Sequence, residues 1–211
     1  MSETPEPRGY LSQAWLVILL ALVYGGALAG VQTKLQPMID ENKRLETYRQ
    51  IPALVGIAES TDDAEIIIEQ RQIEDDDGRK QKVYLALVDG KPQGWVLPAG
   101  GMGFADRIEL LIGLDPAAET ITGLWVLDQK ETPGLGDLIR DEEFRSRFVG
   151  KSTGEHIEAK PEPKRSNEIL TLTGATISSR SVAEIVNQTV ERFKGALRRE
   201  DTTPTSGKPD R

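Results

Sequence analysis

The most regular feature of the chain is an apolar run near its N-terminus. Residues 10–31 contain no charged side chain, and Arg8 and Lys34 bracket the run. A helix of about 20 apolar residues spans the hydrocarbon core of a bilayer. The pattern therefore predicts a transmembrane helix over residues 10–34, preceded by a polar tail at residues 1–9.

A cleaved signal peptide is the alternative interpretation of this run. Ala27-Leu28-Ala29 has the A-x-A form that precedes a cleavage site. The apolar run continues through Val31, however, and no long basic segment precedes it. These two features favour a retained anchor that passes once through the membrane and contacts its lipid.

After the apolar run the sequence becomes charged while staying compatible with a helix. We expect residues 35–55 to form a stalk that leads away from the membrane, and residues 56–199 to form the folded domain. Residues 200–211 are rich in proline, threonine and charged side chains. This composition is typical of a disordered tail.

Short apolar stretches divided by turn residues predict an antiparallel sheet in the domain. Asp89-Gly90-Lys91-Pro92 joins two of them as a hairpin, and we expect Gly100 to Phe104 to be a flexible glycine segment. The predicted strands cover residues 64–73, 82–88, 94–97, 107–114, 120–128 and 168–172.

Helical patterns complete the domain and make the expected fold class α+β. Residues 141–149 predict a short helix in which Phe144 and Phe148 lie on one core-facing side, because they are four positions apart. Residues 178–197 carry apolar side chains at helical spacing. We expect one face of this last helix to pack on the antiparallel sheet.

Composition narrows the possible chemistry. The 26 Lys and Arg residues against 34 Asp and Glu residues give a net charge of -8, which argues against nucleic acid as a partner because binding the many phosphates of a nucleic acid requires a basic surface. The chain has no cysteine and a single histidine, His156. It therefore offers no thiolates for an iron–sulfur cluster and no multi-histidine metal site, so an electron carrier in this chain would be organic.

The run Thr173-Gly174-Ala175-Thr176, directly before the last helical pattern, is a candidate phosphate site. The first N–H groups of a helix lack intrahelical acceptors and lie at the positive end of its dipole, so a helix start attracts phosphate. Gly174 lets a ligand come close, and the Thr176 hydroxyl can be esterified. The alternative is an ordinary helix cap, in which Thr173 or Thr176 accepts hydrogen bonds from the backbone.

A second compact motif, Glu131-Thr132-Pro133-Gly134-Leu135-Gly136, lies earlier in the chain. Pro133 fixes one φ angle, and we expect Gly134 and Gly136 to take left-handed angles. Taken alone, the motif fits a tight loop as well as a binding site.

Together these features resemble a known family. The membrane anchor, the strands, Gly100 to Phe104, Ile121 to Leu127, Glu131 to Gly136 and Thr173 to Thr176 occur in the order seen in the G subunits of Rnf electron transport complexes, along nearly the whole chain. The resemblance implies a flavoprotein component of an ion-translocating ferredoxin:NAD oxidoreductase. It implies an electron carrier rather than a complete enzyme, with FMN as cofactor and no catalytic residue or metal site of its own.

The resemblance also implies how the cofactor is held. In this family FMN is joined through its phosphate to the last threonine of the Thr-Gly-Ala-Thr run, which here is Thr176, by a dedicated flavin transferase. Thr173, Gly174 and Ala175 are then expected around the phosphate. The residues of the second motif expected to lie against the flavin are Glu131, Thr132, Gly134, Leu135 and Gly136.

Partners and location follow from the same resemblance. It implies assembly with the other Rnf subunits in the bacterial inner membrane, with the C-terminal domain on the outer, periplasmic side. The charges flanking the helix favour the opposite orientation, since Arg8 precedes it whereas Lys34, Lys43, Arg44 and Arg49 follow it. Long domains are exported despite such charges, so we expect the outward orientation.

Two positions depart from the family pattern. The acidic residue usual three positions before the first threonine of the run is replaced by Leu170, with Glu168 nearby, which bears on recognition by the transferase. A histidine often seen ahead of the second motif is replaced by Gln129-Lys130. This replacement keeps hydrogen-bonding capacity, and we expect it to adjust the redox behaviour.

Two alternatives remain at this point. The C subunits of Nqr-type Na⁺-translocating NADH:quinone reductases are similar in the same motifs, although the short chain and the Gln129-Lys130 pair look more like an Rnf G subunit. A flavin-free membrane assembly module is the other alternative, and Leu170 is the feature that supports it. Such a module would not need both motifs in their expected order.

Overall fold

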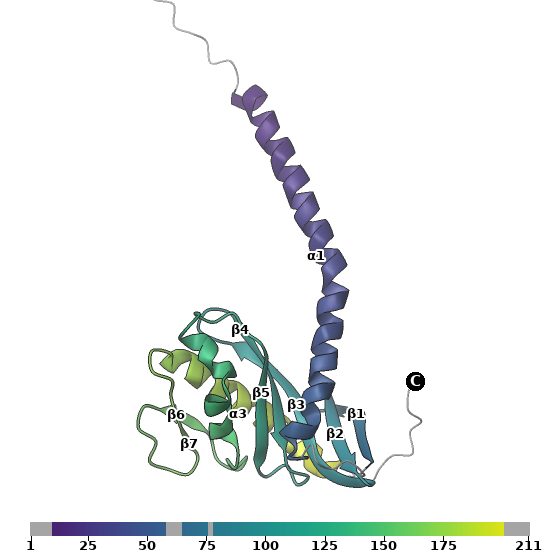
Figure 1. The fold of residues 1–211 in the computed structure, drawn as a ribbon, viewed down its shortest axis with the longest axis vertical. Coiled ribbons are helices and arrows are strands. Elements are labelled where there is room, and N and C mark those ends of the chain that lie inside the picture. Colours follow the sequence, from purple (N-terminus) through teal and green to yellow (C-terminus); the bar gives the residue numbers. More distant parts are fainter. Residues whose placement is uncertain (1–9, 58–64, 76–77, 201–211) are drawn as a thin grey trace, which may run out of the picture. The chain divides into compact units, whose positions relative to one another are not determined.

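The computed structural model describes residues 10–57, 65–75 and 78–200, with side chains from residue 14 onward. Figure 1 shows the order of the helices and strands. The chain divides into two compact units after Leu45.

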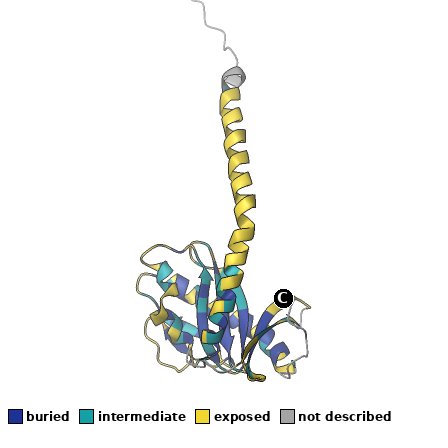
Figure 2. Cartoon of the chain, turned by 45° about the vertical axis from the view of Figure 1, so that its right-hand side comes forward, coloured by how far each residue is buried: buried dark blue, intermediate teal, exposed yellow. Residues whose placement is uncertain are grey.

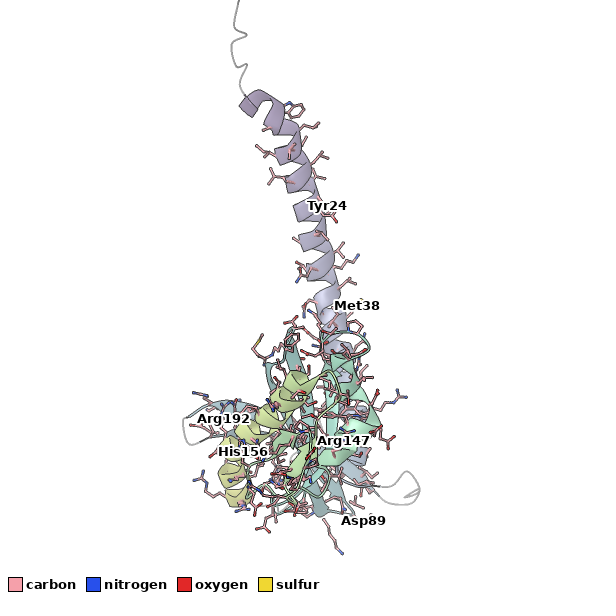
Figure 3. All side chains as sticks on the ribbon, turned by 90° about the vertical axis from the view of Figure 1, so that its left-hand side faces the viewer. Tyr24, Met38, Asp89, Arg147, His156 and Arg192 are labelled. Carbon is pink, nitrogen blue, oxygen red and sulfur yellow. The ribbon has the colours of Figure 1, made fainter. Side chains whose placement is uncertain are left out.

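The first unit is helical. It consists of the first 36 residues of α1 (Tyr10–Leu54), whose apolar part is long enough to cross a membrane. Its side chains are exposed, as the yellow colour in Figure 2 shows, and Figure 3 labels Tyr24 and Met38 among them. An apolar helix with nothing packed on it requires lipid or another protein around it.

The second unit begins earlier than the sequence pattern indicated. We expected a stalk through residue 55, but the compact domain starts at Glu46. The reason is that the last turns of α1 carry buried apolar side chains, with Ile51 at 0% and Leu54 at 5% exposure. These turns are part of the domain's core.

A five-stranded antiparallel sheet forms the centre of the domain, with its strands in sequence order. Its strands are β1 (Ile66–Glu74), β2 (Lys80–Val88), β3 (Lys91–Met102), β4 (Arg107–Leu114) and β5 (Ile121–Asp128). Asp89 and Gly90 form the β2–β3 turn with φ angles of 50° and 72°, as a two-residue hairpin turn requires. Figure 3 labels Asp89. The predicted sheet and the α+β fold class are confirmed, whereas residue 64 of the predicted first strand lies outside the described residues.

Both faces of the sheet are covered. Successive residues of a strand point to opposite faces: Val83, Leu85 and Leu87 of β2 belong to one apolar cluster, and Tyr84 and Ala86 belong to the other. The end of α1 covers the second face. There the Thr122 hydroxyl donates a 2.7 Å hydrogen bond to the Leu54 carbonyl, and Trp125 Nε1 donates to Glu46 Oε1 at 2.9 Å.

The first face is covered by α3 (Thr176–Arg199), the predicted last helix. Its buried apolar residues recur at helical spacing: Val182, Ile185, Val186, Val190, Phe193 and Leu197. Arg192 on this helix, labelled in Figure 3, approaches Asp75 with 3.7 Å between Nε and Oδ2.

The first part of the glycine segment before β4 is strand rather than a flexible loop, which corrects the prediction for Gly100 to Met102, while Gly103 and Phe104 lie in the β3–β4 turn. Gly100 and Gly101 lie inside β3 and pair with Glu109 and Ile108 of β4. A Cβ on Gly101 would lie 2.6 Å from Ile185 Cγ1. The missing side chain therefore lets α3 pack directly on the strand.

Between the sheet and α3 the chain makes three short helical turns instead of the one helix predicted at 141–149. They are η1 (Gly136–Arg140), α2 (Glu142–Arg145) and η2 (Ser146–Phe148). Phe144 and Phe148 are nevertheless both fully buried, with ring centroids 5.7 Å apart in an edge-to-face arrangement. Their predicted role in the core is confirmed.

A small parallel pair, β6 (Glu158–Lys160) and β7 (Glu168–Leu170), leads into the start of α3. The sequence patterns did not indicate β6. Glu168 holds the pair closed: its side chain accepts hydrogen bonds from Lys160 Nζ at 2.7 Å and from the N–H groups of Lys164 and Arg165 at 2.5 and 3.1 Å.

The buried end of α1 gives a test of the domain boundary. Replacing Ile51 by alanine removes a fully buried side chain and is expected to cost about 2–4 kcal/mol of unfolding free energy. Leu45→Ala, at an exposed position, is expected to change it by less than about 0.5 kcal/mol. Both are measured by urea unfolding of the chain from residue 36 onward. Equal changes in unfolding free energy for the two variants would contradict the conclusion that the end of α1 belongs to the core.

Glu168 makes the stability depend on pH. The hydrogen bond from Lys160, with those of the Lys164 and Arg165 amides, lowers the pKa of this carboxyl from 4.5 to about 2. Because the folded pKa is the lower one, the stabilisation is complete above pH 4.5 and is lost as the pH falls toward 2. The difference in melting temperature between the native chain and Glu168→Gln should therefore be largest near neutrality and shrink over this range. A difference independent of pH would assign the effect to packing instead.

Candidate functional site

The Thr-Gly-Ala-Thr run forms the entry to α3, as expected, but it does not cap the helix. The N-cap residue is Ala175, and no side chain caps the helix start. The N–H groups of Thr176, Ile177 and Ser178 find no acceptor among the described residues. The cap interpretation is therefore wrong, and three helix N–H groups remain available to a ligand.

A buried serine that the sequence analysis missed holds the backbone that leads into α3. The hydroxyl of Ser179 donates to the Ala175 carbonyl at 2.9 Å and accepts the Leu172 N–H at 3.0 Å. Gly174 between them has φ of +79°, a left-handed angle that favours glycine. The only sequence signal for this serine was its place in the first turn of a predicted helix.

The second motif is a tight loop held by one carbonyl group. The carbonyl of Thr132 accepts the N–H groups of Leu135, Gly136 and Asp137 at 3.2, 2.9 and 3.3 Å. Gly134 has the expected left-handed φ of +75°, but Gly136 does not. A Cβ on Gly136 would instead lie 2.9 Å from both Glu131 Cβ and Ser178 Oγ, so close packing explains this glycine.

The structure brings the two motifs into contact. A Cβ on Gly174 would lie 2.9 Å from Leu135 Cδ2, so the Leu135 side chain lies directly over the backbone of the Thr-Gly-Ala-Thr run. Leu135 is still 43% exposed. The two motifs thus form one surface, with Leu135 at their junction.

Glu131 lies behind this surface and joins three segments. Its side chain is 4% exposed. Oε1 accepts the N–H of Ala105, in the turn between β3 and β4, at 3.0 Å, and Oε2 accepts the hydroxyl of Ser178, in the first turn of α3, at 2.5 Å. Both carboxylate oxygens are therefore engaged within the protein.

The predicted site residues divide by their exposure. Thr173, Gly174, Thr132, Gly134 and Leu135 are exposed, and Thr176 is half-buried. Glu131, Gly136 and Ala175 are buried behind them. The first group can contact a ligand directly, whereas the second group supports it.

Of the two departures from the family pattern, only Gln129 makes a hydrogen bond with its side chain; Leu170 contributes a backbone carbonyl. The carbonyl of Leu170 accepts a 2.8 Å hydrogen bond from Arg147 Nη1, while the Leu170 side chain is 42% exposed. The Gln129 Oε1 accepts the N–H of Glu131 at 2.5 Å. The hydrogen-bonding capacity expected of Gln129 is thus used to fix the backbone of Glu131.

Asp137, directly after the second motif, was not among the predicted site residues. Its Oδ1 is buried and has no hydrogen-bond donor among the described residues. A buried carboxylate oxygen is costly to leave unpaired. Within the described part of the chain, Asp137 Oδ1 is therefore an unsatisfied buried acceptor beside the second motif.

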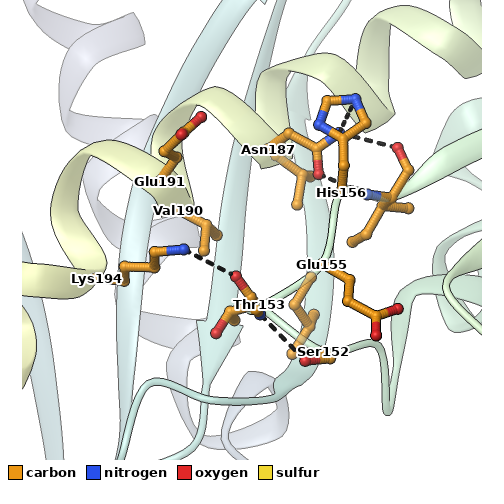
Figure 4. A pocket seen from close by; sticks show the side chains of 12 residues that line it. Ser152, Thr153, Glu155, His156, Asn187, Val190, Glu191 and Lys194 are labelled. Carbon is orange, nitrogen blue, oxygen red and sulfur yellow. Dashed lines mark hydrogen bonds between the residues drawn. The ribbon is translucent and has the colours of Figure 1, made fainter.

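A polar cavity lies elsewhere on the domain, beside the middle of α3 (Figure 4). Its walls include Thr153, His156, Asn187 and Lys194. At 1.5 Å per residue, Asn187 is about 16 Å further along the helix axis than Thr176. This cavity is separate from the surface that the two motifs form.

The fold and the motifs define a flavin-binding class of domain. Residues 103–191 match the FMN-binding domain family. The fold is shared with NqrC of Shewanella oneidensis, with a TM-score of 0.59 and 17% identity over 74% of this chain and 97% of that chain. It is also shared with the C subunit of the Na(+)-translocating NADH-quinone reductase of Parabacteroides distasonis, with a TM-score of 0.59 and 22% identity over 78% and 96% of the two chains.

Sequence relatives give the particular family. The G subunit of the ion-translocating oxidoreductase complex of Methanosarcina acetivorans is 30% identical over 177 residues, 83% of this chain and 89% of that protein. The G subunit of the proton-translocating ferredoxin:NAD(+) oxidoreductase complex of Clostridium ljungdahlii is 33% identical over 129 residues, 61% and 64% of the two chains. The chain belongs to the family of G subunits of ion-translocating oxidoreductase complexes, as its motifs predicted.

Two left-handed glycines, one in the Thr-Gly-Ala-Thr run and one in the β2–β3 turn, provide a matched test of the junction. Gly174→Ala and Gly90→Ala place a side chain at similar φ angles, 79° and 72°, and each is expected to cost about 1 kcal/mol of stability. Only the first new methyl meets Leu135, since nothing lies within 4 Å of a Cβ on Gly90. Gly174→Ala alone should therefore shift the Leu135 methyl resonances in a ¹³C NMR spectrum. Unchanged methyl resonances in that variant would contradict the contact between the motifs.

Proposed function

We propose that the chain is the membrane-anchored FMN carrier of an Rnf-type ferredoxin:NAD oxidoreductase complex, and that it carries FMN as a phosphoester on Thr176. The observation that carries the proposal is the uncapped start of α3. Three helix N–H groups there lack acceptors among the described residues, the threonine hydroxyl is next to them, and the second motif contacts the same surface.

The residues at the start of α3 fit a phosphate group. Helix N–H groups and the helix dipole stabilise negative charge. Gly174 lets the phosphate approach the backbone closely, and the exposed Thr173 adds a hydroxyl. Arg180 is four residues after Thr176 and so lies on the same side of the helix, where its cation neutralises part of the phosphate charge.

The exposed residues around this point fit the remainder of FMN. Leu135, which is 43% exposed, offers an apolar side chain beside the run. The Gly136 N–H is unavailable, because it donates to Thr132. When bound, FMN supplies the exchange of electrons, while the chain orients it and keeps it attached to the domain.

An ester bond suits a surface of this kind. Thr132, Gly134, Leu135 and Thr173 are all exposed, so the surface buries little of a ligand. A ligand that is little buried binds weakly without a covalent bond, because affinity for small molecules depends on the area removed from water. A covalent link at Thr176 would hold the cofactor in place without an enclosing pocket.

Location and partners follow from the family. We propose that residues 10–34 cross the bacterial inner membrane, that residues 35–45 form a short stalk, and that the domain lies on the periplasmic side. Two relatives are named as subunits of ferredoxin:NAD(+) oxidoreductase complexes. The partners of this chain are then the other Rnf subunits, the surrounding lipid, and a flavin transferase during maturation.

The experiment that tests the proposal is co-expression of the full chain with a flavin transferase. The native chain should gain the mass of FMN minus one water and show flavin fluorescence after denaturation and gel electrophoresis. Thr176→Ala should lose both, because no ester oxygen remains, while Thr173→Ala, which has its hydroxyl three residues earlier, should keep the covalent label.

Leu170 makes the negative outcome informative. A native chain of unmodified mass, together with a labelled Leu170→Asp variant, would assign the failure to the missing acidic residue. If neither chain is labelled but bound FMN is released on denaturation, the covalent part of the proposal is wrong. Colourless protein in both cases would favour the flavin-free assembly module.

A further inference from the structure

The turn between β3 and β4 belongs to the same surface as the two motifs. Ala105 in this turn donates its N–H to Glu131 Oε1 at 3.0 Å, and the turn is closed by a 2.8 Å hydrogen bond from the Gly103 N–H to the Asp106 carbonyl. A Cβ on Gly103 would lie 2.3 Å from Glu131 Oε1. The turn is therefore packed directly against the carboxylate.

The other side of Glu131 is equally tight. Ser178 is 2% exposed and donates to Oε2 at 2.5 Å. Gly136 has no room for a side chain between Glu131 and Ser178. Three segments thus meet at the buried side chain of Glu131: the β3–β4 turn, the second motif and the first turn of α3.

Three exposed apolar residues are next in the chain to the residues that meet at this junction. Phe104, Leu135 and Ile177 are 60%, 43% and 54% exposed. Each is the immediate chain neighbour of a residue packed on Glu131, namely Ala105, Gly136 and Ser178. Exposed large apolar side chains that each segment contributes beside one junction are candidates for contact with a ligand.

We propose that the β3–β4 turn is a third wall of the flavin site, that Phe104 is the side chain this wall presents to the flavin, and that Glu131 is the positioning residue that holds the wall against α3. This proposal rests on the proposed function. Glu131 then acts through the turn and the helix rather than by touching FMN, since both of its oxygens are already bonded.

A carboxylate suits this role because two donors face it from different segments. Alanine at this position would leave the Ala105 N–H and the Ser178 hydroxyl unpaired in a buried place, and the turn would move away. Glutamine has the same shape. It can accept from Ala105 with its oxygen and donate to Ser178 with its amide group, so Glu131→Gln keeps the three segments together while removing the charge.

The experiment uses the full chain, loaded with FMN by a co-expressed transferase. Iodide quenching of the flavin fluorescence reports how far solvent reaches the ring, and the midpoint potential reports its surroundings. Glu131→Ala and Phe104→Ala should both raise the quenching constant and shift the potential. Glu131→Gln should keep the native quenching constant and shift only the potential, because it changes charge but not position.

Two control variants separate this role from general destabilisation. Asn187→Ala removes a buried side chain that, like Glu131, is hydrogen-bonded to another segment: Oδ1 accepts the Ile157 N–H and Nδ2 contacts the Ile157 carbonyl, at 2.9 Å each, and His156 Nε2 at 3.1 Å. Ile67→Ala shortens an exposed apolar side chain at the end of the sheet far from the β3–β4 turn, since Ile67 pairs with Leu87 beside the β2–β3 turn. Both should keep native quenching and potential.

The outcomes are distinct. If the native chain takes up FMN but Glu131→Ala and Phe104→Ala quench like the two controls, the third wall is wrong and the proposed function stands. If Phe104→Ala raises quenching but Glu131→Ala does not, Glu131 is not the positioning residue. A native chain without any FMN overturns the proposed function and this proposal together.

Discussion

The arrangement of the candidate site depends on one buried carboxylate. Glu131 accepts hydrogen bonds from Ala105, 26 residues before it, and from Ser178, 47 residues after it. Each donor left unpaired in such a place would cost about 1–3 kcal/mol. The carboxylate therefore holds together three segments that belong to no common helix or strand: the β3–β4 turn, the second motif and the first turn of α3. The tight loop that follows it, closed on the Thr132 carbonyl, can then present Leu135 to the start of α3.

The sheet lies between α1 and α3, the helix that begins at the candidate site. The last turns of α1 pack on one face, through Ile51 and Leu54, and α3 packs on the other. Alternation of side chains along each strand allows both faces to be buried at once. The helix that begins with Thr176 is thereby supported along its length by a core that does not involve the exposed apolar part of α1. The site residues can stay exposed because this support lies beneath them.

The exposed character of the site agrees with the proposed electron relay. A carrier that passes electrons between neighbouring proteins of a complex needs its cofactor near the surface, and the two motifs form a surface rather than a cavity. The polar cavity beside Asn187 lies well along α3 and takes no part in this arrangement. Under the proposed function the ester at Thr176 supplies the retention that burial does not. The uncapped helix start then has a reason, since the phosphate would take the place of a cap.

Local pattern determined much of this protein. The alternation of apolar residues predicted the strands and the last helix, and the two motifs predicted the site residues and the family. Tertiary structure decided the rest, because those features depend on contacts between distant parts of the chain. Periodicity could not show that α1 joins the core from Glu46, or that Gly101 serves the packing of Ile185. Nor could it show that Glu131 faces inward, since nothing near it in sequence reveals the two donors that it binds. The sequence by itself determined the two motifs and the family, and only the fold decided which of the motif residues are exposed and which are buried behind them.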